Sequence, residues 1–484
     1  MNINIAIIQP LGYVHSLVFV DVARALRHGL RRIGITAHIT KNRLRADCTN
    51  WILGGHLALR PEQIAGHRCV IVNLEQMGHG GAALTDEYLH LLKSHPVLDY
   101  DAANLAAYRL PGLPTGLFEF SHASYLERPA PSLRDRKIDL LFYGSVNDRR
   151  RELFRQIEAS GVAVTCFDKP IYTEERDHYI RNAKAILNCS FYEAHRFEQV
   201  RAFHCLSLGT PVVCERILGQ AIPKRFQESC FFFDPNDRAA FFGREFRGGD
   251  FFGEADRRLA GWRASTPVGD MALMGFIKET EAYLDQKAKG PAGPWQPTRI
   301  NLGSGKDYRL GWLNVDVDAS VQPDLVLDLS RPIQFPIRLR SELGGEVELV
   351  PGSVEEFFAD NVLEHVPDLP RLMTQVLALL RTGGRFVVQV PYEGAPTAWQ
   401  DPTHVRAFNQ NSWLYYTDWF WYLGWFEHRF QVETLEWQDV QMKPCERPSA
   451  AFIKVILQKV ETTPWERTIA RTMRSNFGGI PEDL

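Results

Sequence analysis

Residues 299–318, RINLGSGKDYRLGWLNVDVD, constrain this chain most, because they join two short apolar segments through a glycine turn. The first four residues have the pattern of a buried strand. Gly303 and Gly305 then allow a tight turn and the close approach of a ligand, which a Cβ would obstruct. Asp316 ends the second apolar segment, and in doubly wound sheets an acidic residue at such a strand end binds ribose hydroxyls. The pattern predicts a nucleotide-type cofactor site.

Three further motifs follow downstream, with a helix-like run before the last: DLVLDLS, FFADNVLEHV and GGRFVVQVP. Over residues 298–459 this order resembles the class I S-adenosylmethionine (SAM) dependent methyltransferases. The resemblance implies a Rossmann-like methyltransferase domain at residues 299–460, followed by a tail at 461–484. It also implies SAM as cofactor and a cofactor site formed by Gly303, Ser304, Gly305, Asp316, Asp328, Asp360 and Asn361.

The loop after the predicted fifth strand, PYEGAPTAWQDPTHVRAFN, carries candidate catalytic residues. Methyl transfer requires the acceptor hydroxyl in line with the sulfonium, and that hydroxyl must lose its proton. His404, with an unperturbed pKa of about 6.5, can be the general base, with Asp401 orienting its ring. A purely structural loop is the alternative. Glu364 and His365 are expected at the rim of the cofactor pocket, where His365 has a capping or core role as its alternative.

Residues 412–426, SWLYYTDWFWYLGWF, are crowded with aromatic rings. Packing in a half-buried strand is the simpler explanation. The alternative is a wall of the substrate site, because apolar pockets with few polar anchors are typical of ligand sites.

The first 285 residues contain two successions of strands and helices. Apolar runs at residues 3–8, 36–40, 51–53, 69–73 and 117–120 predict strands of a first lobe at residues 1–130, and residues 17–33 have helical spacing. A charged, proline-bearing stretch at 127–137 then leads to a second lobe at residues 131–285. The fold class expected for the whole chain is therefore α/β, with two Rossmann-like lobes before the methyltransferase-like domain.

Residues 187–215, LNCSFYEAHRFEQVRAFHCLSLGTPVVCE, are similar to the donor lobe of GT-B glycosyltransferases of bacterial surface polysaccharide synthesis, with FYGSVNDRR and VNLEQM upstream. The resemblance implies the GT-B arrangement and a sugar nucleotide as donor substrate. Many retaining members have a second glutamate where this chain has His204, which leaves stereochemistry and activity open. The residues expected to bind the donor are Gly144, Ser145, Arg149, Glu198, Arg201 and Glu215.

Arg201 can offer a guanidinium fork to a diphosphate, and Glu198 or Glu215 can accept from ribose or sugar hydroxyls. The alternative for Glu198 and Arg201 is a surface ion pair, and the alternative at Gly144 is an ordinary turn. A cationic cradle lowers the barrier to glycosyl transfer without a metal, and no metal site is expected. Glu75 is the candidate base of the first lobe, with a satisfied buried glutamate as its alternative.

The net charge and the cysteine pattern restrict the class of partner and the compartment that we expect for this protein. A formal net charge of −3 offers no basic field for a nucleic acid. Eight cysteines without a CxxC pair argue against a zinc module or a disulfide framework, and predict a reducing cytoplasm. The N-terminus lacks the pattern of a signal peptide, and no apolar stretch approaches the roughly 20 residues of a membrane span. Residues 286–298, rich in proline and glycine, predict a linker.

The sequence thus predicts a bifunctional cytoplasmic enzyme of glycan assembly, in which the second half methylates a sugar hydroxyl. The expected partners are a sugar nucleotide and a glycan or lipid-linked glycan acceptor, and contact with the inner face of a membrane and the oligomeric state stay open. One alternative is a single methyltransferase activity beside a glycan-binding first half. Another is a scaffold with vestigial cofactor sites.

Overall fold

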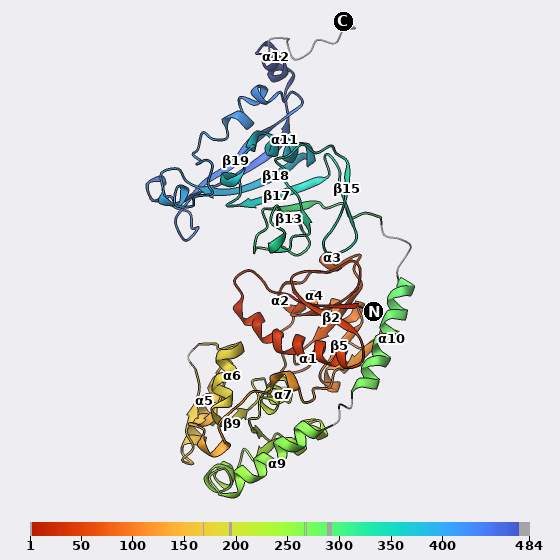
Figure 1. The fold of residues 1–484 in the computed structure, drawn as a ribbon, viewed down its shortest axis with the longest axis vertical. Coiled ribbons are helices and arrows are strands. Elements are labelled where there is room, and N and C mark those ends of the chain that lie inside the picture. The colour runs from red at the N-terminus through yellow and green to blue at the C-terminus, as the bar shows by residue number, and fades with distance from the viewer. Residues whose placement is uncertain are drawn as a thin grey trace. The chain divides into compact units, whose positions relative to one another are not determined.

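The computed structural model describes residues 2–473, except residues 168, 193–195, 266, 268 and 288–292. The chain forms two compact units, residues 1–289 and 290–484. Each is a mixed α/β structure with parallel, Rossmann-like sheets (Figure 1). Part of the predicted linker and the end of the predicted tail lie outside the described residues. The described part of the tail forms a helix, α12 (Pro464–Thr472).

The N-terminal unit begins with a parallel sheet of order β2-β1-β3-β4-β5-β6. Its central strands β3 and β4 are fully buried and mostly apolar, because helices such as α1 (Val18–Arg32) cover the sheet. The predicted strand at residues 117–120 is wrong in position. The strands are β1 (Asn2–Ile7), β2 (Thr36–Lys41), β3 (Thr49–Leu53), β4 (Cys69–Asn73), β5 (Val97–Asp99) and β6 (Thr115–Leu117).

Short helices connect the strands of this first sheet and follow its central strands. They are α2 (Gly55–Ala58), α3 (Pro61–Ile64) and α4 (Asp86–Ser94).

The second sheet of this unit is also parallel, with the order β11-β10-β9-β7-β8. Its strands are β7 (Ile138–Leu141), β8 (Val164–Thr165), β9 (Ala183–Asn188), β10 (Val212–Glu215) and β11 (Phe231–Phe233). The connecting helices are α5 (Asp148–Glu158), α6 (Thr173–Arg181), α7 (Gln199–Ser207) and α8 (Lys224–Ser229).

Two long helices end the unit, α9 (Asp250–Ala264) and α10 (Asp270–Lys287). The second returns to the first sheet, where the ring of Phe276 lies directly over Gly116 of β6. An ion pair of Arg32 with Asp270 fixes the start of α10 against α1. Phe120 and Phe203 stack 4.7 Å apart, so the two sheets share one hydrophobic core.

Both sheets are doubly wound: with strands numbered along the chain within each sheet, the order is 2-1-3-4-5-6 in the first and 2-1-3-4-5 in the second. In such sheets the strand order reverses at one point, and ligands bind beside it at the carboxyl ends of the strands. The reversal lies between β1 and β3 in the first sheet and between β7 and β9 in the second. These ends are therefore the expected ligand positions of the N-terminal unit.

The C-terminal unit is built on a seven-stranded sheet of order β14-β13-β12-β17-β18-β20-β19. All neighbours are parallel except β20, which is antiparallel to β18 and to β19. The strand order reverses between β12 and β17. The strands are β12 (Arg299–Leu302), β13 (Leu313–Asp316), β14 (Leu325–Val326), β17 (Val354–Asp360), β18 (Leu380–Pro391), β19 (His428–Gln438) and β20 (Phe452–Glu461).

One addition beside this sheet did not follow from the sequence. A two-stranded antiparallel ribbon, β15 (Ile337–Arg340) and β16 (Glu346–Leu349), lies between β14 and β17 in the chain. The helix α11 (Leu369–Leu379) buries its apolar face against the sheet.

The sequence had indicated a half-buried strand for the aromatic segment at residues 412–426. This prediction is wrong. The segment forms two short 3-10 helices, Leu414–Tyr416 and Phe420–Leu423. Trp413 and Phe420 are buried in the core, whereas the rings of Tyr415, Trp419 and Tyr422 are exposed. The segment thus fixes itself with some rings and presents others to solvent.

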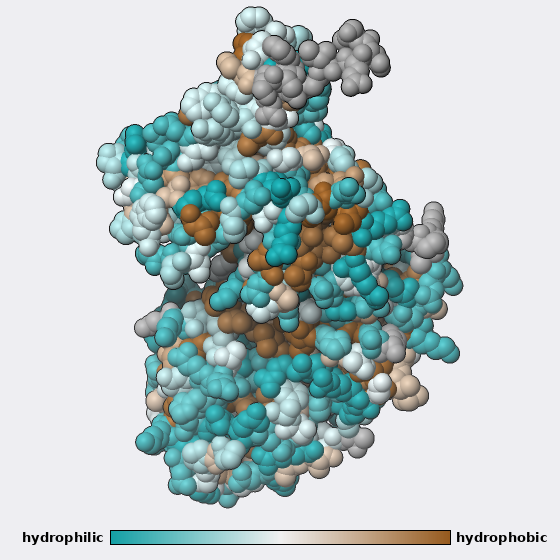
Figure 2. Space-filling model, turned by 45° about the horizontal axis from the view of Figure 1, so that its top comes forward, coloured by the Kyte–Doolittle hydropathy of each residue, from teal (hydrophilic) through white to brown (hydrophobic). Residues whose placement is uncertain are grey.

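The surface on the face shown in Figure 2 is mostly hydrophilic, with hydrophobic patches between the polar regions. Among the described residues, no helix combines the length and apolar character needed to cross a bilayer.

Candidate functional site

The glycine turn after β12 has the geometry of a cofactor-binding loop. Gly303 and Gly305 have φ angles of +63° and +46°, which side chains disfavour. A Cβ at Gly303 would lie 2.3 Å from Cγ2 of Val362, so this position accepts glycine alone without rearrangement. The backbone N–H of Ser304 donates to the carbonyl of Val315 at 3.0 Å. The turn is therefore packed tightly against the ends of both neighbouring strands.

Asp316, at the carboxyl end of β13, holds this turn in place. Its Oδ2 accepts a hydrogen bond from the N–H of Gly305 at 2.8 Å, and its Oδ1 accepts from the N–H of Asp318 at 2.9 Å. A carboxylate has lone pairs for further donors, so two such bonds leave acceptor capacity toward a ligand. Asp316 is thus oriented beside the glycine turn, where the sequence predicted a ribose-binding acid.

The other predicted cofactor residues occupy neighbouring strand ends. Asp360 ends β17, and Asn361 follows it with a φ of +52°, donating from Nδ2 to Oδ1 of Asp360 at 3.0 Å. Burial, and to a lesser degree the charge of Asp307, raise the pKa of Asp360. Asp328 follows β14. Burial opposes its ionisation, but hydrogen bonds from Ser330 and Arg331 hold the pKa of Asp328 below its usual value.

Glu364, His365 and His404 form a cluster of titratable groups after β17 and β18. Glu364 is 1% exposed, and neither of its carboxylate oxygens has a hydrogen-bond partner among the described residues. Burial raises the pKa of Glu364 to about 7. His404 has its Nε2 4.0 Å from Oε1 of Glu364, and its ring lies edge-on to that of His365 with the centroids 4.7 Å apart. The sequence had indicated Glu364 as a rim residue, without this contact.

The expected orientation of His404 by Asp401 is wrong, because a different group holds the ring. Nδ1 of His404 lies 2.8 Å from the carbonyl oxygen of Ala398, which fixes Nδ1 as the N–H donor. Asp401 instead accepts two hydrogen bonds from Thr403, which lower the pKa of Asp401. Oγ1 of Thr403 lies 2.9 Å from Nδ1 of His365. The carboxylate of Asp401 is therefore linked by hydrogen bonds through Thr403 to the ring of His365 rather than to that of His404.

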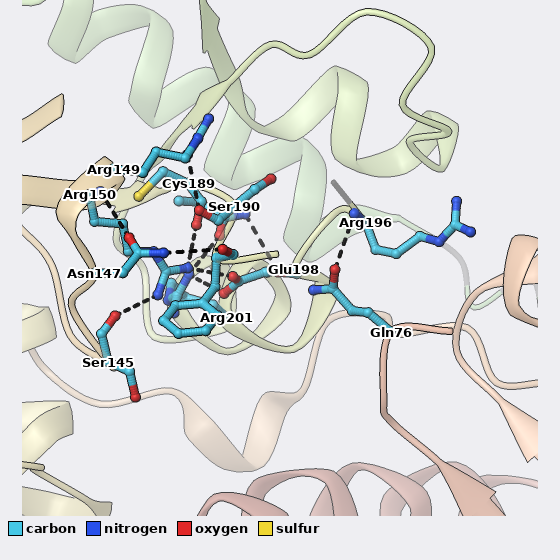
Figure 3. A network of polar contacts seen from close by, with 12 residues as sticks. Gln76, Ser145, Asn147, Arg149, Arg150, Cys189, Ser190, Arg196, Glu198 and Arg201 are labelled. Atoms are coloured by element: carbon cyan, nitrogen blue, oxygen red, sulfur yellow. Dashed lines mark hydrogen bonds and ion pairs between the residues drawn. The ribbon is translucent and has the colours of Figure 1, made fainter. Parts of the chain in front are cut away.

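In the N-terminal unit, Arg150 is the centre of a buried network at the end of β7 (Figure 3). Its guanidinium donates to the carbonyl oxygens of Ser145 at 2.8 Å and Cys189 at 2.5 Å, and to Oε1 of Glu198 at 2.6 Å. Arg150 was not predicted from the sequence, because its partners lie up to 48 residues away in the chain. The network ties the ends of β7 and β9 together at the point where the strand order reverses.

Glu198 and Arg201 are not the surface ion pair that the alternative interpretation described. Their side chains are 19% and 11% exposed, and Glu198 lies at the start of α7 as its N-cap residue. Arg201 pairs with Glu198 and donates to Oδ1 of Asn188 at 3.0 Å and to the carbonyl of Tyr143 at 3.3 Å. Its cation is thus used within the protein, close to Gly144, whose φ is +123°.

Arg149 and Glu215 are less completely satisfied. Arg149, 38% exposed, donates to the carbonyl of Ser190 at 3.0 Å and to Oε1 of Glu215 at 2.6 Å. The second carboxylate oxygen of Glu215 is buried and has no hydrogen-bond partner among the described residues. Of the predicted donor residues, Arg149 therefore presents the most accessible cation, and Glu215 offers a vacant acceptor.

Glu75 lies in a loop after β4 that a polar network holds. The backbone of Glu75 bonds with the side chains of Asn73 and Asn104, and both of these amides donate to buried Asp99. The carboxylate of Glu75 lies 3.3 Å from Nε2 of His56, and burial lowers the pKa of this histidine. The loop is rigidly built, as a satisfied structural glutamate or a positioned base requires.

The same loop also meets the second sheet's residues. Oε1 of Gln76 accepts from the N–H of Arg196 at 3.3 Å (Figure 3), just before α7. The first and second lobes of this unit therefore contact each other next to Glu198.

His204 occupies the position where the resemblance suggested a second glutamate. It is buried, with Nε2 2.9 Å from Nη2 of Arg176 and 2.8 Å from Oδ1 of Asp177. Arg176 in turn pairs with Asp21 of α1 at 2.5 Å. His204 is thus part of a buried network that joins the two sheets.

No protein-family model and no curated protein matches the chain. Solved structures match parts of it. A SAM-dependent methyltransferase from Archaeoglobus fulgidus is 12% identical over 37% of this chain and 93% of its own, with a TM-score of 0.23. One from Mesorhizobium loti is 17% identical over 36% of this chain and 96% of its own, with a TM-score of 0.22. TarM is 13% identical over 50% of this chain and 54% of its own, with a TM-score of 0.29.

Proposed function

We propose that the C-terminal unit is a SAM-dependent methyltransferase acting on a sugar hydroxyl, and that the N-terminal unit is a glycosyltransferase of GT-B type. The observation that carries the methyltransferase proposal is the glycine turn clamped by Asp316 beside the reversal of strand order. Ligands of doubly wound sheets bind at this position. The motifs of this unit are also similar to those of class I methyltransferases.

The cofactor's ribose would be bound by Asp316, with the Gly303–Gly305 turn against its methionine part and Asp360 and Asn361 at the adjacent strand end. Asp328 would border the adenosine side. These roles follow the strand order, because the carboxyl ends of β12, β13, β14 and β17 lie next to one another at one edge of the sheet.

His404 is the proposed general base. Its Nδ1 donates to Ala398, so the lone pair of Nε2 is free to accept the proton of an acceptor hydroxyl. The hydroxyl oxygen then bonds to the methyl carbon while the carbon–sulfur bond of the sulfonium breaks, which leaves a neutral thioether. Glu364, 4.0 Å away, would stabilise the imidazolium that forms. The exposed rings of Tyr415, Trp419 and Tyr422 would pack on the apolar faces of the sugar.

The glycosyltransferase proposal rests on the cationic network at the carboxyl ends of β7 and β9. Arg149 and the backbone N–H groups after Gly144 and Ser145 would bind the departing diphosphate, and Arg201 would add positive charge from behind. Glu215 would accept from a donor hydroxyl through its unpartnered oxygen. Glu75 would act as the base on the acceptor side.

One observation favours a second candidate, a single methyltransferase activity beside a glycan-binding N-terminal unit. Arg150 and Arg201 both bond to Glu198, and Arg149 bonds to Glu215, so each of these three cations already has an anionic partner. Under this candidate the N-terminal unit holds the glycan without cleaving a sugar nucleotide. A scaffold with two vestigial sites is the third candidate.

Both activities suit an enzyme of surface glycan assembly in the cytoplasm, with a glycan or lipid-linked glycan as acceptor. The proposed domains are residues 1–130 and 131–285 for the two GT-B lobes, 286–298 for the linker and 299–460 for the methyltransferase.

The test is incubation of the protein with methyl-labelled SAM and a panel of sugar nucleotides, with glycan acceptors present and absent. Binding of both ligands, with label in the glycan and release of nucleoside diphosphate, supports two activities. Binding of SAM without any sugar nucleotide supports the second candidate. A folded protein that binds neither ligand supports the scaffold and contradicts the proposed function.

A further inference from the structure

Glu364, His365 and His404 bring three potential metal ligands together. One ligand atom from each, a carboxylate oxygen and two imidazole nitrogens, lies within 4.8 Å of the other two. Glu364 and His365 belong to the short 3-10 helix Leu363–His365 after β17, and His404 belongs to the loop after β18. A backbone hydrogen bond from Val405 to the carbonyl of Glu364 at 2.8 Å fixes the loop against this helix. The cluster is therefore built by two elements held in register.

The carboxylate of Glu364 is the first observation that points to a cation. It is 1% exposed, and both of its oxygens are buried without a hydrogen-bond donor among the described residues. Among the described residues, its ion-pair contact within 4.0 Å is with His404, and no arginine or lysine pairs with it. Buried carboxylates in proteins are ordinarily paired, protonated or coordinated to a metal.

The outer contacts of the two histidines are the second observation. Nδ1 of His404 donates to the carbonyl of Ala398 at 2.8 Å. Nδ1 of His365 lies 2.9 Å from Oγ1 of Thr403, whose hydroxyl donates to Oδ1 of Asp401 at 2.6 Å and so accepts from the histidine. Both rings therefore keep the lone pair on Nε2. Metal-binding histidines show this arrangement, with the second ring nitrogen donating to a carbonyl or to a carboxylate-backed partner.

We propose that Glu364, His365 and His404 bind a divalent cation of the zinc class, with open positions that take hydroxyl groups of the acceptor sugar. This inference rests on the proposed methyltransferase function of the same site. Two imidazoles and one carboxylate suit zinc and neighbouring first-row metals, whereas magnesium and calcium prefer oxygen ligands alone. Three protein ligands also leave a position for substrate, as in catalytic rather than structural zinc sites.

The cation changes how the acceptor hydroxyl loses its proton. With Nε2 of His404 bound to the metal, a metal-bound hydroxyl gives its proton to solvent water, because the cation lowers the pKa of that hydroxyl. Its oxygen then forms the bond to the methyl carbon of SAM, and the carbon–sulfur bond breaks with its electron pair remaining on sulfur. No metal site was expected from the sequence, and His404 was predicted as a base and Glu364 as a rim residue.

The experiment is calorimetric titration of chelator-treated full-length protein with Zn²⁺, with Mg²⁺ as comparison. The variants are Glu364→Gln, which keeps the shape of the side chain, and Thr403→Val, which removes the hydroxyl behind His365. His428→Ala is the matched control, since this histidine lies in the same unit on β19.

We expect one tight Zn²⁺ site in the wild type and in His428→Ala, with far weaker binding of Mg²⁺. Thr403→Val should weaken Zn²⁺ binding about ten- to hundredfold, the usual effect of losing an outer contact, and Glu364→Gln by at least as much. Zn²⁺ should also raise the melting temperature of the wild type and not that of Glu364→Gln.

Equal Zn²⁺ affinity in the wild type and Glu364→Gln, or no tight site in the folded wild type, would overturn the metal site. Titration with SAM in the same chelator-treated sample separates this result from a failure of the proposed function. SAM binding without a zinc site leaves the methyltransferase intact and returns His404 to its role as base. A zinc site without SAM binding keeps the metal site and refutes the methyltransferase.

Discussion

The two units treat their buried charges in opposite ways. In the N-terminal unit, Arg150 and Arg201 both bond to Glu198, and backbone carbonyls accept further hydrogen bonds from both guanidinium groups. In the C-terminal unit, Glu364 is buried among two histidines with neither oxygen satisfied. In the first network each of these charged groups has a partner of opposite charge, whereas in the second the carboxylate has no hydrogen-bond partner among the described residues.

This difference distinguishes buried charges that stabilise the fold from a buried charge that can bind a ligand. A buried ion pair is weak evidence for net stability, but removal of one partner is costly because the other charge stays buried. An unpartnered buried carboxylate is costly in itself and becomes favourable when a ligand binds. We therefore expect variants of the first network to lose stability and variants of the second to lose binding.

The largest expected effect is on stability, in Arg201→Ala. With Arg201 11% exposed, the free energy of unfolding should fall by about 3–5 kcal/mol, the cost of breaking a buried pair. Calorimetric melting is the measurement. The control is Arg151→Ala, whose exposed pair with Asp148 contributes at most about 1 kcal/mol. Equal melting temperatures for the two variants would show that the network carries no stability.

A second effect on stability is expected in the C-terminal unit, where it depends on packing around Gly303 rather than on buried charge. Gly303→Ala should destabilise the fold by about 1–2 kcal/mol from the left-handed backbone and about 1–3 kcal/mol more from the contact with Val362. Gly352→Ala is the matched control, with a φ of +70° and open space around its Cβ. Urea unfolding gives both values. The same loss in both variants would mean that the turn is not closely packed on Val362.

A smaller effect is expected in the N-terminal unit for Glu215. This predicted donor-binding residue has one carboxylate oxygen without a hydrogen-bond partner among the described residues. Glu215→Gln keeps the bond from Arg149 to Oε1, so the melting temperature should change little. Affinity for nucleoside diphosphate sugars should fall about tenfold, since one hydrogen bond to a charged acceptor contributes about 1.5 kcal/mol or more. Titration of both proteins with UDP-sugars checks this. Undiminished affinity in the variant would remove Glu215 from the donor site.

The sequence predicted the sheet-forming segments well where the pattern is local. The strand of residues 69–73 and the glycine turn with Asp316 at a strand end could be found because both depend on neighbouring residues. The aromatic segment at 412–426 misled, because a run of large rings has no period and is equally compatible with a strand or with short 3-10 helices.

The candidate sites were harder to predict, because they depend on contacts between distant segments. Arg150 bonds to Glu198, 48 residues later, and no local pattern distinguishes it from its two neighbouring arginines. Glu364 gains its character from complete burial and from the approach of His404, 40 residues away. Asp401 is only three residues from His404, yet its carboxylate accepts hydrogen bonds from Thr403 and not from the ring of His404. Proximity in sequence suggested the wrong partner.

The central claim is that Asp316 and the glycine turn bind SAM. Its most direct test is calorimetric titration of the full-length protein and of Asp316→Asn with SAM, with Asp318→Asn as the neighbouring control. The wild type and Asp318→Asn should bind one SAM per chain. Asp316→Asn should bind about a hundredfold more weakly or worse, because it weakens two hydrogen bonds to a charged acceptor while keeping the shape of the side chain. A folded wild type that binds no SAM, or equal affinity in Asp316→Asn, would contradict the claim.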